Sequence, residues 1–467
     1  MAGYFAVGET KTRPGAYFNV QSNGNGDSYG AIDGIVAVLF KSNMGPLNKA
    51  QILEAGDGYE TVYGTGGTTD AIREALYGGA RQILAVRVGS GGTAAKLDIT
   101  VGDNKKVTIT AKYAGAASYK ATVRAKLGDS EKKECIIYLD SAEFEKVTFP
   151  ADSTDEVAGF VSAFASSKNF DVTAETGAAG VIPIASQSAF TAGTDPTTAA
   201  ADYTNALKEV EKHYFNTICI DTEDTQIQAL VAAFLDRIYE EGNFGMAVFA
   251  QASTVALATR VATAAAYNSE KVVFVVNAKA QAGDLELGGY QIAAYVAGVI
   301  ASTAANQSVT HTVTRYTELL DALTNSEIEN AEQNGCLVLS TSTDGSVWLD
   351  NGINTLVTPD ADHDNGWKKI RRTKTRFELM FRANAAADAL IGRVSNDVNG
   401  RATIASAVQA VCNAMVNEGK IQYALVEEST SNVADGDACW FDIDVIDLDS
   451  AEHIYLTYNF RFSTVMA

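Results

Sequence analysis

Short buried strands that alternate with helical stretches constrain the fold of this chain more than any other feature. Gly34–Phe40 reads GIVAVLF and residues 81–89 read RQILAVRVG, two continuous apolar runs. Such runs are typical of strands covered on both faces of a parallel sheet. The stretch between them, TTDAIREALYGGA, has a helical pattern with Thr68 or Thr69 as its expected N-cap. This opening predicts a β-α-β unit within an α/β domain.

The pattern changes between residues 91 and 190. The segments KLDITV, KVTITAKY, ATVRAKL and CIIYLD alternate polar and apolar residues, as half-exposed antiparallel strands do. One helical stretch, TDEVAGFVSAFASS, interrupts them. We therefore expect a separate β-rich domain that is inserted into the α/β domain.

The α/β pattern returns after residue 190, with a helix expected at Asp202–Tyr214 and buried strands such as FNTICID and KVVFVVN. A chain of 467 residues is too long for one core, so several domains are expected. The predicted fold class is an α/β core with an inserted β-rich domain and an α+β C-terminal domain, with extended N- and C-terminal arms. The predicted boundaries are 1–30 for the N-terminal arm, 31–90 plus 191–352 for the α/β core, 91–190 for the inserted β-rich domain, and 353–467 for the C-terminal domain with its terminal strand arm.

Both ends of the chain have strand character. The C-terminal domain is expected to hold a helix over a basic run, a helix at Ala402–Asn417 and three strands. The third strand, EHIYLTYNFRF at residues 452–462, alternates strictly between two faces. The first thirty residues are rich in Gly, Asn and Ser, and GAYFNV is their one strand-like stretch. The residues alone leave open whether the last strand completes its own sheet or pairs with another chain.

The charge of the chain is unevenly distributed. The formal net charge is -21, which argues against general nucleic-acid binding because phosphate recognition needs basic faces. Six of the ten residues at 367–376, WKKIRRTKTR, are nevertheless basic. No apolar run is long enough to cross a bilayer, and we recognise no secretory leader. The sequence therefore predicts neither a nucleic-acid partner nor membrane insertion.

No catalytic set emerges from the motifs. The four histidines lack HExxH spacing, the five cysteines include no CxxC pair, and YGTGGTTD lacks a Walker lysine. Asp360, Asp362 and Asp364 have the spacing of the first EF-hand ligands. Asn365 and Arg371 stand where that loop needs Gly and Glu, so a solvated acidic loop is favoured over weak calcium binding. The sequence predicts no enzyme, no catalytic or metal residues, and no cofactor.

Several stretches resemble contractile phage tail sheath proteins. They include RPGAYFNV near the start, AKYAGAASYKATV at the opening of the insert and FTAGTDPTTAAADYTNALKEVEKHYFNTI at the return to the core. The C-terminal region adds WLDNGINTLVTPDADHDNGWKKIRRTKTRFELM, IGRVSNDVNGRATIASAVQAVCNAMVNEGKI and DGDACWFDIDVIDLDSAEHIYLTYNFRF. These stretches run from residue 13 to residue 462 in the family's order, although Ala114 stands where a proline is common. They are most similar to sheaths of myophages and of R-type phage-tail-like bacteriocins of Gram-positive bacteria.

The resemblance implies a structural subunit. Sheath proteins of this family polymerise as stacked hexameric rings around an inner tube, are metastable when extended, and contract to drive the tube through a cell envelope. The implied partners are further copies of the chain, the inner tail tube protein, and baseplate and tail terminator proteins. The implied place of assembly is the bacterial cytoplasm, before release in a phage tail or tail-like particle. The alternatives are an α/β enzyme with an inserted β domain, or another self-assembling phage structural protein.

The resemblance also implies which residues make contacts, because family sheaths exchange terminal strands and touch the tube through the C-terminal domain. A solvated helix face and the carboxylates of a neighbouring subunit are the alternative surroundings for the basic run. Inter-subunit strand exchange is expected at Ala16, Tyr17, Phe18, Asn19, Val20, Ile454, Tyr455, Leu456, Thr457, Tyr458, Asn459 and Phe460. Contact with the inner tube is expected at Lys368, Lys369, Arg371, Arg372, Lys374 and Arg376.

Overall fold

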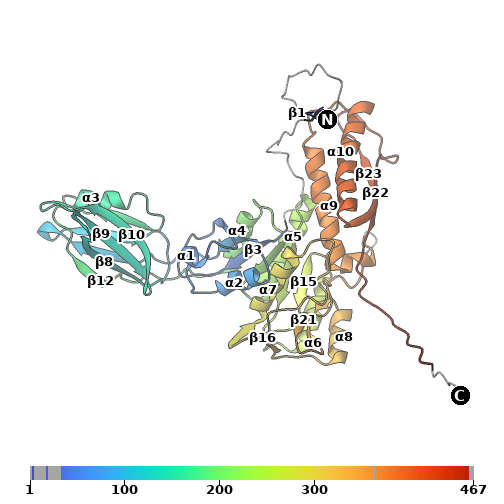
Figure 1. Cartoon of the computed structure of the whole chain (residues 1–467), viewed down its shortest axis with the longest axis horizontal. Helices are drawn as coiled ribbons and strands as arrows, with labels where there is room; N and C mark the ends of the chain where they lie inside the picture. Colours follow the sequence, from blue (N-terminus) through green and yellow to red (C-terminus); the bar gives the residue numbers. More distant parts are fainter. Residues whose placement is uncertain (1–2, 5–16, 19–32, 361–362, 462–467) are drawn as a thin grey trace.

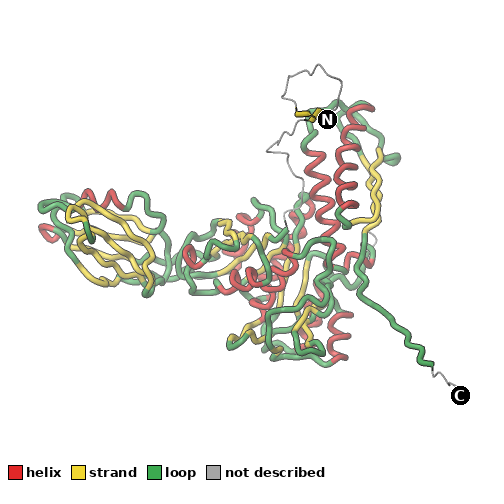
Figure 2. Tube along the Cα trace, viewed as in Figure 1, coloured by secondary structure: helices red, strands yellow, loops and turns green. Residues whose placement is uncertain are grey.

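The computed structural model describes residues 3–4, 17–18, 33–360 and 363–461. Figure 1 shows a β-sandwich at one end, a central sheet flanked by helices, and long C-terminal helices beside a hairpin. Strands dominate the sandwich, and a long loop ends the described chain (Figure 2). The fold is a mixed α/β fold, as predicted, while the predicted domain boundaries stay predictions. Among the described residues, no helix is long and apolar enough to cross a bilayer.

The central sheet has seven strands in the order β19-β15-β14-β13-β3-β5-β4. All neighbours pair in parallel except β4, which runs antiparallel to β5. All six residues of β3 are buried, as the apolar run predicts. The edge strand β4 has no such run and is not predicted by the sequence pattern. The strands are β3 Ile35–Phe40, β4 Ala50–Glu54, β5 Gln82–Arg87, β13 Thr217–Ile220, β14 Met246–Ala250, β15 Val272–Val275 and β19 Cys336–Leu337.

Helices cover both faces of the central sheet. Val36 and Val38 of β3 belong to one apolar cluster with α2 and α7. Ala37 and Leu39 belong to another cluster with α4, α5 and α6, as the period of two in a strand requires. The helices are α1 Glu60–Tyr63, α2 Asp70–Tyr77, α4 Ala200–Val210, α5 Thr225–Glu240, α6 Leu257–Tyr267, α7 Gly289–Ser302 and α8 Asn325–Gln333.

Two glycines let α2 and α7 approach each other at backbone distance. A Cβ on Gly78, just after α2, would lie 2.1 Å from the backbone oxygen of Tyr295. A Cβ on Gly298 would lie 2.1 Å from the backbone oxygen of Ala75. Because no side chain fits in these gaps, only glycine permits this packing.

The crevice at the carboxyl ends of β3 and β13 is the place where α/β folds commonly bind ligands. Here the buried carboxylate of Asp221 accepts hydrogen bonds from Thr68 Oγ1 at 2.5 Å and from the Tyr203 hydroxyl at 2.6 Å. Lys41 Nζ lies 3.3 Å from the same carboxylate. Thr69 is the N-cap residue of α2, one of the two threonines expected there, but its side chain makes no capping hydrogen bond. The Thr68 side chain donates to Asp221 instead.

The β-rich insert forms a sandwich of two antiparallel sheets, with orders β10-β9-β8-β12 and β11-β7-β6. Their facing side chains form a separate apolar cluster that includes Ile109, Ile137, Phe160 and Phe170. The elements are β6 Lys96–Thr100, β7 Lys106–Ala111, β8 Tyr119–Lys126, β9 Asp129–Leu139, β10 Ala142–Pro150, α3 Val157–Ala163, β11 Phe170–Ala174 and β12 Ala185–Ala189.

Four elements form what we call the C-terminal module: α9, α10, β22 and β23. The helix predicted at Ala402–Asn417 is formed, and Val408, Val411 and Met415 of α10 are buried, whereas Ile404 is half-buried. The module comprises α9 Ile370–Asp388, α10 Val398–Asn417, β22 Ile421–Glu428 and β23 Phe441–Asp447. The short elements before it are β16 Lys279–Ala282, β17 Leu285–Gly288, β18 Glu318–Leu319, β20 Leu339–Thr341, β21 Val347–Leu349 and the 3-10 turn η2 Asn365–Lys368.

Candidate functional site

The β22–β23 hairpin has two open edges. Its strands pair antiparallel, and in the part of the chain that the structure describes neither strand has a second neighbour. One face packs against α10 through Ala424 and Val426. On the other face, Tyr423 and Ile446 are 48% and 53% exposed. The edges present unpaired backbone groups to which a strand of another chain can add.

The segment that follows β23 leaves the body of the molecule. Residues 448–461 belong to no helix or strand, and they run outward to the C-terminus (Figure 1). The strand predicted at residues 452–462 is therefore not formed within the single chain, because no neighbouring strand supplies its hydrogen bonds; Phe462 lies outside the described residues. The residues predicted to exchange are all exposed, and their exchange stays a prediction. They are Ile454, Tyr455, Leu456, Thr457, Tyr458, Asn459 and Phe460.

The predicted N-terminal strand is described only in part. Tyr17–Phe18 forms β2, which pairs in parallel with β1 at Gly3–Tyr4. Ala16, Asn19 and Val20 lie outside the described residues. Pairing of this strand with a neighbouring chain, which the family resemblance implies, stays a prediction.

The basic run turns inward at the start of α9, and all six of its cations are buried or half-buried. Arg372 Nε and Nη2 donate to Asp447 at 3.0 and 2.7 Å, and Arg376 Nε donates to the same carboxylate at 2.9 Å. Burial alone would raise the pKa of Asp447, but the two guanidiniums hold it below its usual value. The solvated helix face considered for this run is therefore wrong, because carboxylates of the same chain pair with it.

The acidic loop ahead of the run is also tied to α9. Asp364 accepts a hydrogen bond from Gly366 N at 3.0 Å and forms an ion pair with Arg376 at 3.0 Å. Asp362 lies outside the described residues. Within the described ranges, no group of three or more His, Cys, Asp or Glu side chains is placed to hold a metal ion.

Lys369 and Glu452 join the root of the terminal segment to the body. Lys369 is the N-cap residue of α9 and forms an ion pair with the Glu452 carboxylate. Glu452 also accepts hydrogen bonds from Ser308 Oγ at 2.7 Å and from Thr310 Oγ1 at 2.9 Å. Burial opposes ionisation, yet these donors hold the pKa of Glu452 below its ordinary value.

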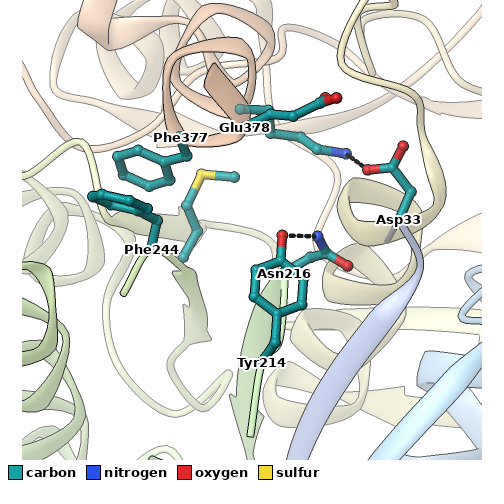
Figure 3. Close-up of a pocket in the computed structure, with 8 residues that line it drawn as sticks. Asp33, Tyr214, Asn216, Phe244, Phe377 and Glu378 are labelled. Atoms are coloured by element: carbon teal, nitrogen blue, oxygen red, sulfur yellow. Dashed lines mark hydrogen bonds and ion pairs between the residues drawn. The ribbon is translucent and has the colours of Figure 1, made fainter. Parts of the chain in front are cut away.

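Lys374 is buried where α9 meets the central sheet. Its ammonium donates to the backbone oxygens of Ile300, at 2.6 Å, and of Thr303. These carbonyls end α7, where the helix dipole favours a cation. Asp33 lies 4.0 Å from the ammonium, and Figure 3 shows how Asp33 and Glu378 reach this small pocket from different elements. Burial lowers the pKa of Lys374 to about 8.

The two remaining cations have fewer contacts. Lys368 Nζ donates to the backbone oxygen of Glu332 at 3.1 Å. Arg371 is only 7% exposed, and its Nε and Nη1 have no hydrogen-bond partner among the described residues. A buried donor without a partner is costly. The contact of the basic run with an inner tube stays a prediction.

Sequence reasoning did not find the acidic partners of the run. The carboxylates of DIDVIDLD alternate with apolar residues in the sequence, and nothing in this pattern distinguishes Asp447, whose side chain is only 12% exposed, from the exposed Asp442 and Asp444. Glu452 gave no signal of its own. One available signal was the spacing of Arg372 and Arg376, four residues apart on one side of a helix.

Comparison with known proteins finds similarity to a phage tail sheath family model and to two curated proteins. Residues 197–355 match the family model of the phage tail sheath protein central domain. The uncharacterized protein YqbK of Bacillus subtilis (strain 168) is 27% identical over 381 residues, which span 79% of this chain and 78% of that protein. The phage-like element PBSX protein XkdK of the same organism is 24% identical over 382 residues, again 79% and 78% of the two chains.

Solved structures share the fold. The sheath tail protein of Desulfitobacterium hafniense has a TM-score of 0.69 at 23% identity, over 93% of this chain and 100% of that chain. The sheath of an extracellular contractile injection system in its contracted state has a TM-score of 0.55 at 10% identity, over 97% and 98% of the two chains. The likeness therefore extends over nearly the whole chain.

Proposed function

We propose that this chain, part of which matches the phage tail sheath central domain, is a structural subunit of a contractile tail sheath. Its copies polymerise as stacked hexameric rings around an inner tube, and contraction of the polymer drives the tube through a cell envelope. Assembly takes place in the bacterial cytoplasm, with the inner tube, baseplate and tail terminator proteins as partners. The matched domain and the shared fold of a contracted sheath support this proposal.

One observation carries the proposal: the chain has a two-stranded sheet with open edges and, after it, an exposed segment with a strand-like sequence that pairs with no strand of its own chain. Among the described residues the hairpin has no third strand, and the terminal segment exposes alternating apolar side chains, with Leu456 at 69% and Phe460 at 90%. Adding this segment to the hairpin of a second copy would pair the open edge and bury those side chains. We propose that the terminal arms link neighbouring subunits in this way, and that these links persist while the bodies of the subunits move during contraction.

Proline scanning of the terminal segment tests strand exchange. Thr457 and Tyr458 are exposed and belong to no strand in the single chain, so proline at either position leaves the subunit intact. Neighbouring backbone N–H groups of a strand point to opposite sides, so one of the two prolines removes a ladder hydrogen bond whichever edge is used. We expect Thr457→Pro or Tyr458→Pro to reduce polymer yield at least tenfold.

The matched controls are Thr457→Ala and Tyr458→Ala, which keep the backbone donors. Polymers are counted by negative-stain microscopy and sedimentation, and the monomer is checked by thermal unfolding. Normal cylinders from both proline variants would show that this segment does not form an exchanged strand.

The tube contact of the basic run is a narrower proposal. Arg372, Lys374 and Arg376 already hold contacts within the chain, so reversing their charge would damage the subunit itself. Lys368 has one backbone partner, and Lys368→Glu is the milder test, with Lys368→Gln as control. Weaker cosedimentation of the folded Glu variant with purified tubes supports the contact, and unchanged cosedimentation of both variants removes Lys368 from it.

A further inference from the structure

Glu452 is the one residue among 451–461 whose side chain is buried against the body of the molecule. All described residues in this range are exposed except Glu452, whose side chain is 9% exposed. β23 ends at Asp447. Glu452, five residues later, binds to the body of the molecule again.

The pocket that holds Glu452 is built from two parts of the molecule. Ser308 and Thr310 lie in the connection after α7, and they donate to the same carboxylate oxygen, Oε1. Lys369 donates to the other oxygen, Oε2, from the N-terminal end of α9. The pocket itself is fixed, since Gly352 N donates to Thr310 Oγ1 at 2.9 Å and Lys369 Nζ also reaches Asn351 Oδ1 at 3.2 Å.

We infer that Glu452 is the anchor of the C-terminal arm and fixes the point from which residues 453–461 reach a second copy of this chain. This inference rests on the proposed strand exchange and deepens it. One residue of the basic run, Lys369, then contributes to the pocket that binds the Glu452 side chain.

The anchor shortens the free arm. From Glu452, residues 453–461 span at most about 30 Å, whereas release of Glu452 would free residues 448–461 with a reach of about 45 Å. A shorter arm with a fixed exit direction keeps the strand near its acceptor edge and lowers the ordering cost of each exchange. Tension on an exchanged arm also passes through Glu452 to the loop after α7 and to α9, before it reaches β23.

Hydrogen exchange of the unpolymerised full-length chain tests the anchor without requiring assembly. Glu452 holds the hydroxyls of Ser308 and Thr310, and these hydroxyls accept from the backbone N–H groups of Thr310 and Gly352. We therefore expect Glu452→Ala to raise the exchange rate of these two amides about tenfold. Glu452→Gln keeps an acceptor for Ser308 and Thr310 but loses the charge that Lys369 requires, so its effect should be smaller. Asp444→Ala, at an exposed carboxylate eight residues earlier, is the matched control and should leave exchange unchanged.

The critical concentration for polymerisation, measured by sedimentation, gives the functional readout. We expect it to rise severalfold in Glu452→Ala, in step with the loss of protection, and to recover partly when Glu452→Lys is combined with Lys369→Glu. Unchanged exchange and unchanged critical concentration in Glu452→Ala would overturn the anchor. A chain that ends after Glu452 separates the two ideas. Normal polymers from it would refute strand exchange, while the exchange rates of the Thr310 and Gly352 amides still test the anchor.

Discussion

The β-sandwich and the C-terminal module differ in how completely they cover their apolar surface and in how much charge they bury. In the sandwich, two sheets cover each other's apolar faces, and the Phe160 ring meets those of Phe149 and Phe164 at centroid distances of 5.0 and 5.3 Å. In the C-terminal module, one helix covers one face of a two-stranded sheet. The buried face of α9 there carries Lys374 and Glu378.

The sandwich therefore covers its apolar faces with strands of its own chain. The C-terminal module has open strand edges and exposed apolar side chains that a second chain would cover. The sandwich takes its stability from apolar burial, which needs no second chain. The C-terminal module has an apolar cluster of its own but also buries paired charges, and it exposes apolar side chains on the hairpin and the terminal segment. Substitutions in the sandwich should therefore reduce stability and spare assembly, whereas substitutions in the module should change both.

The largest effect is expected from Phe160→Ala in the sandwich. Phe160 is completely buried, and removing a buried ring costs about 3–5 kcal/mol of unfolding free energy. Thermal unfolding and hydrogen exchange should show a loss confined to residues 91–190, with normal cylinders in negative stain below the new unfolding temperature.

The control for this substitution is Leu127→Ala in the same region, at a side chain that is 95% exposed. It should change the unfolding free energy by less than about 0.5 kcal/mol. A Phe160→Ala chain that folds but no longer polymerises would contradict the comparison, because it would make the sandwich part of the assembly.

A smaller effect is expected from Asp447→Ala in the C-terminal module. The substitution leaves Arg372 and Arg376 half-buried without their shared carboxylate, which should cost about 2–3 kcal/mol. Hydrogen exchange should rise in β23 and in the first turns of α9, and polymer yield should fall because the root of the arm is loosened. Asp444→Ala, exposed on the same strand, is the control; equal effects of the two would show that the contact with the arginines is unimportant.

Local sequence pattern predicted the central sheet and α10 because burial in them follows a short period. Each residue of Ile35–Phe40 is buried as a continuous apolar run requires, and Val408 and Met415 face inward at helical spacing. The resemblance to phage tail sheath proteins is confirmed by the match of residues 197–355. The pattern located the N-cap of α2 at Thr69 but not its chemistry, because the Thr69 side chain makes no capping hydrogen bond and Thr68 donates to Asp221, 153 residues away.

The same limit explains why the surroundings of the basic run were not predicted. Arg372 and Asp447 are 75 residues apart, and Lys369 and Glu452 are 83 residues apart. No periodicity within a window of ten or twenty residues reports such pairs. Six cations in an acidic chain indicated that carboxylates would be near, but only the fold decides whether these belong to the same chain.

The smallest effect concerns the buried charge of Lys374. Because the pKa of Lys374 falls to about 8 on folding, the folded chain releases this proton at a lower pH than the unfolded chain, whose lysine has a pKa of about 10.4. Between pH 8 and pH 10 the unfolded state therefore binds more protons, and the free energy of unfolding rises with pH through this group. The gain from pH 7 to pH 9 should be about 1 kcal/mol.

Comparison with Lys374→Met isolates this gain, because the raised pKa values of the buried tyrosines act equally in both chains. The charged groups that act on the pKa of Lys374 are Asp33, Glu378 and Lys420, and both chains contain all three. In denaturant titrations, the free energy of unfolding of the wild-type chain minus that of Lys374→Met should increase from pH 7 to pH 9. The control is Lys208→Met, at an exposed lysine of α4, and the difference between the wild-type chain and this variant should not change with pH. If the difference between the wild-type chain and Lys374→Met is the same at pH 7 and pH 9, then α7 and Asp33 keep the ammonium protonated over this range. The buried charge of this module would then be as insensitive to pH as the apolar core of the sandwich.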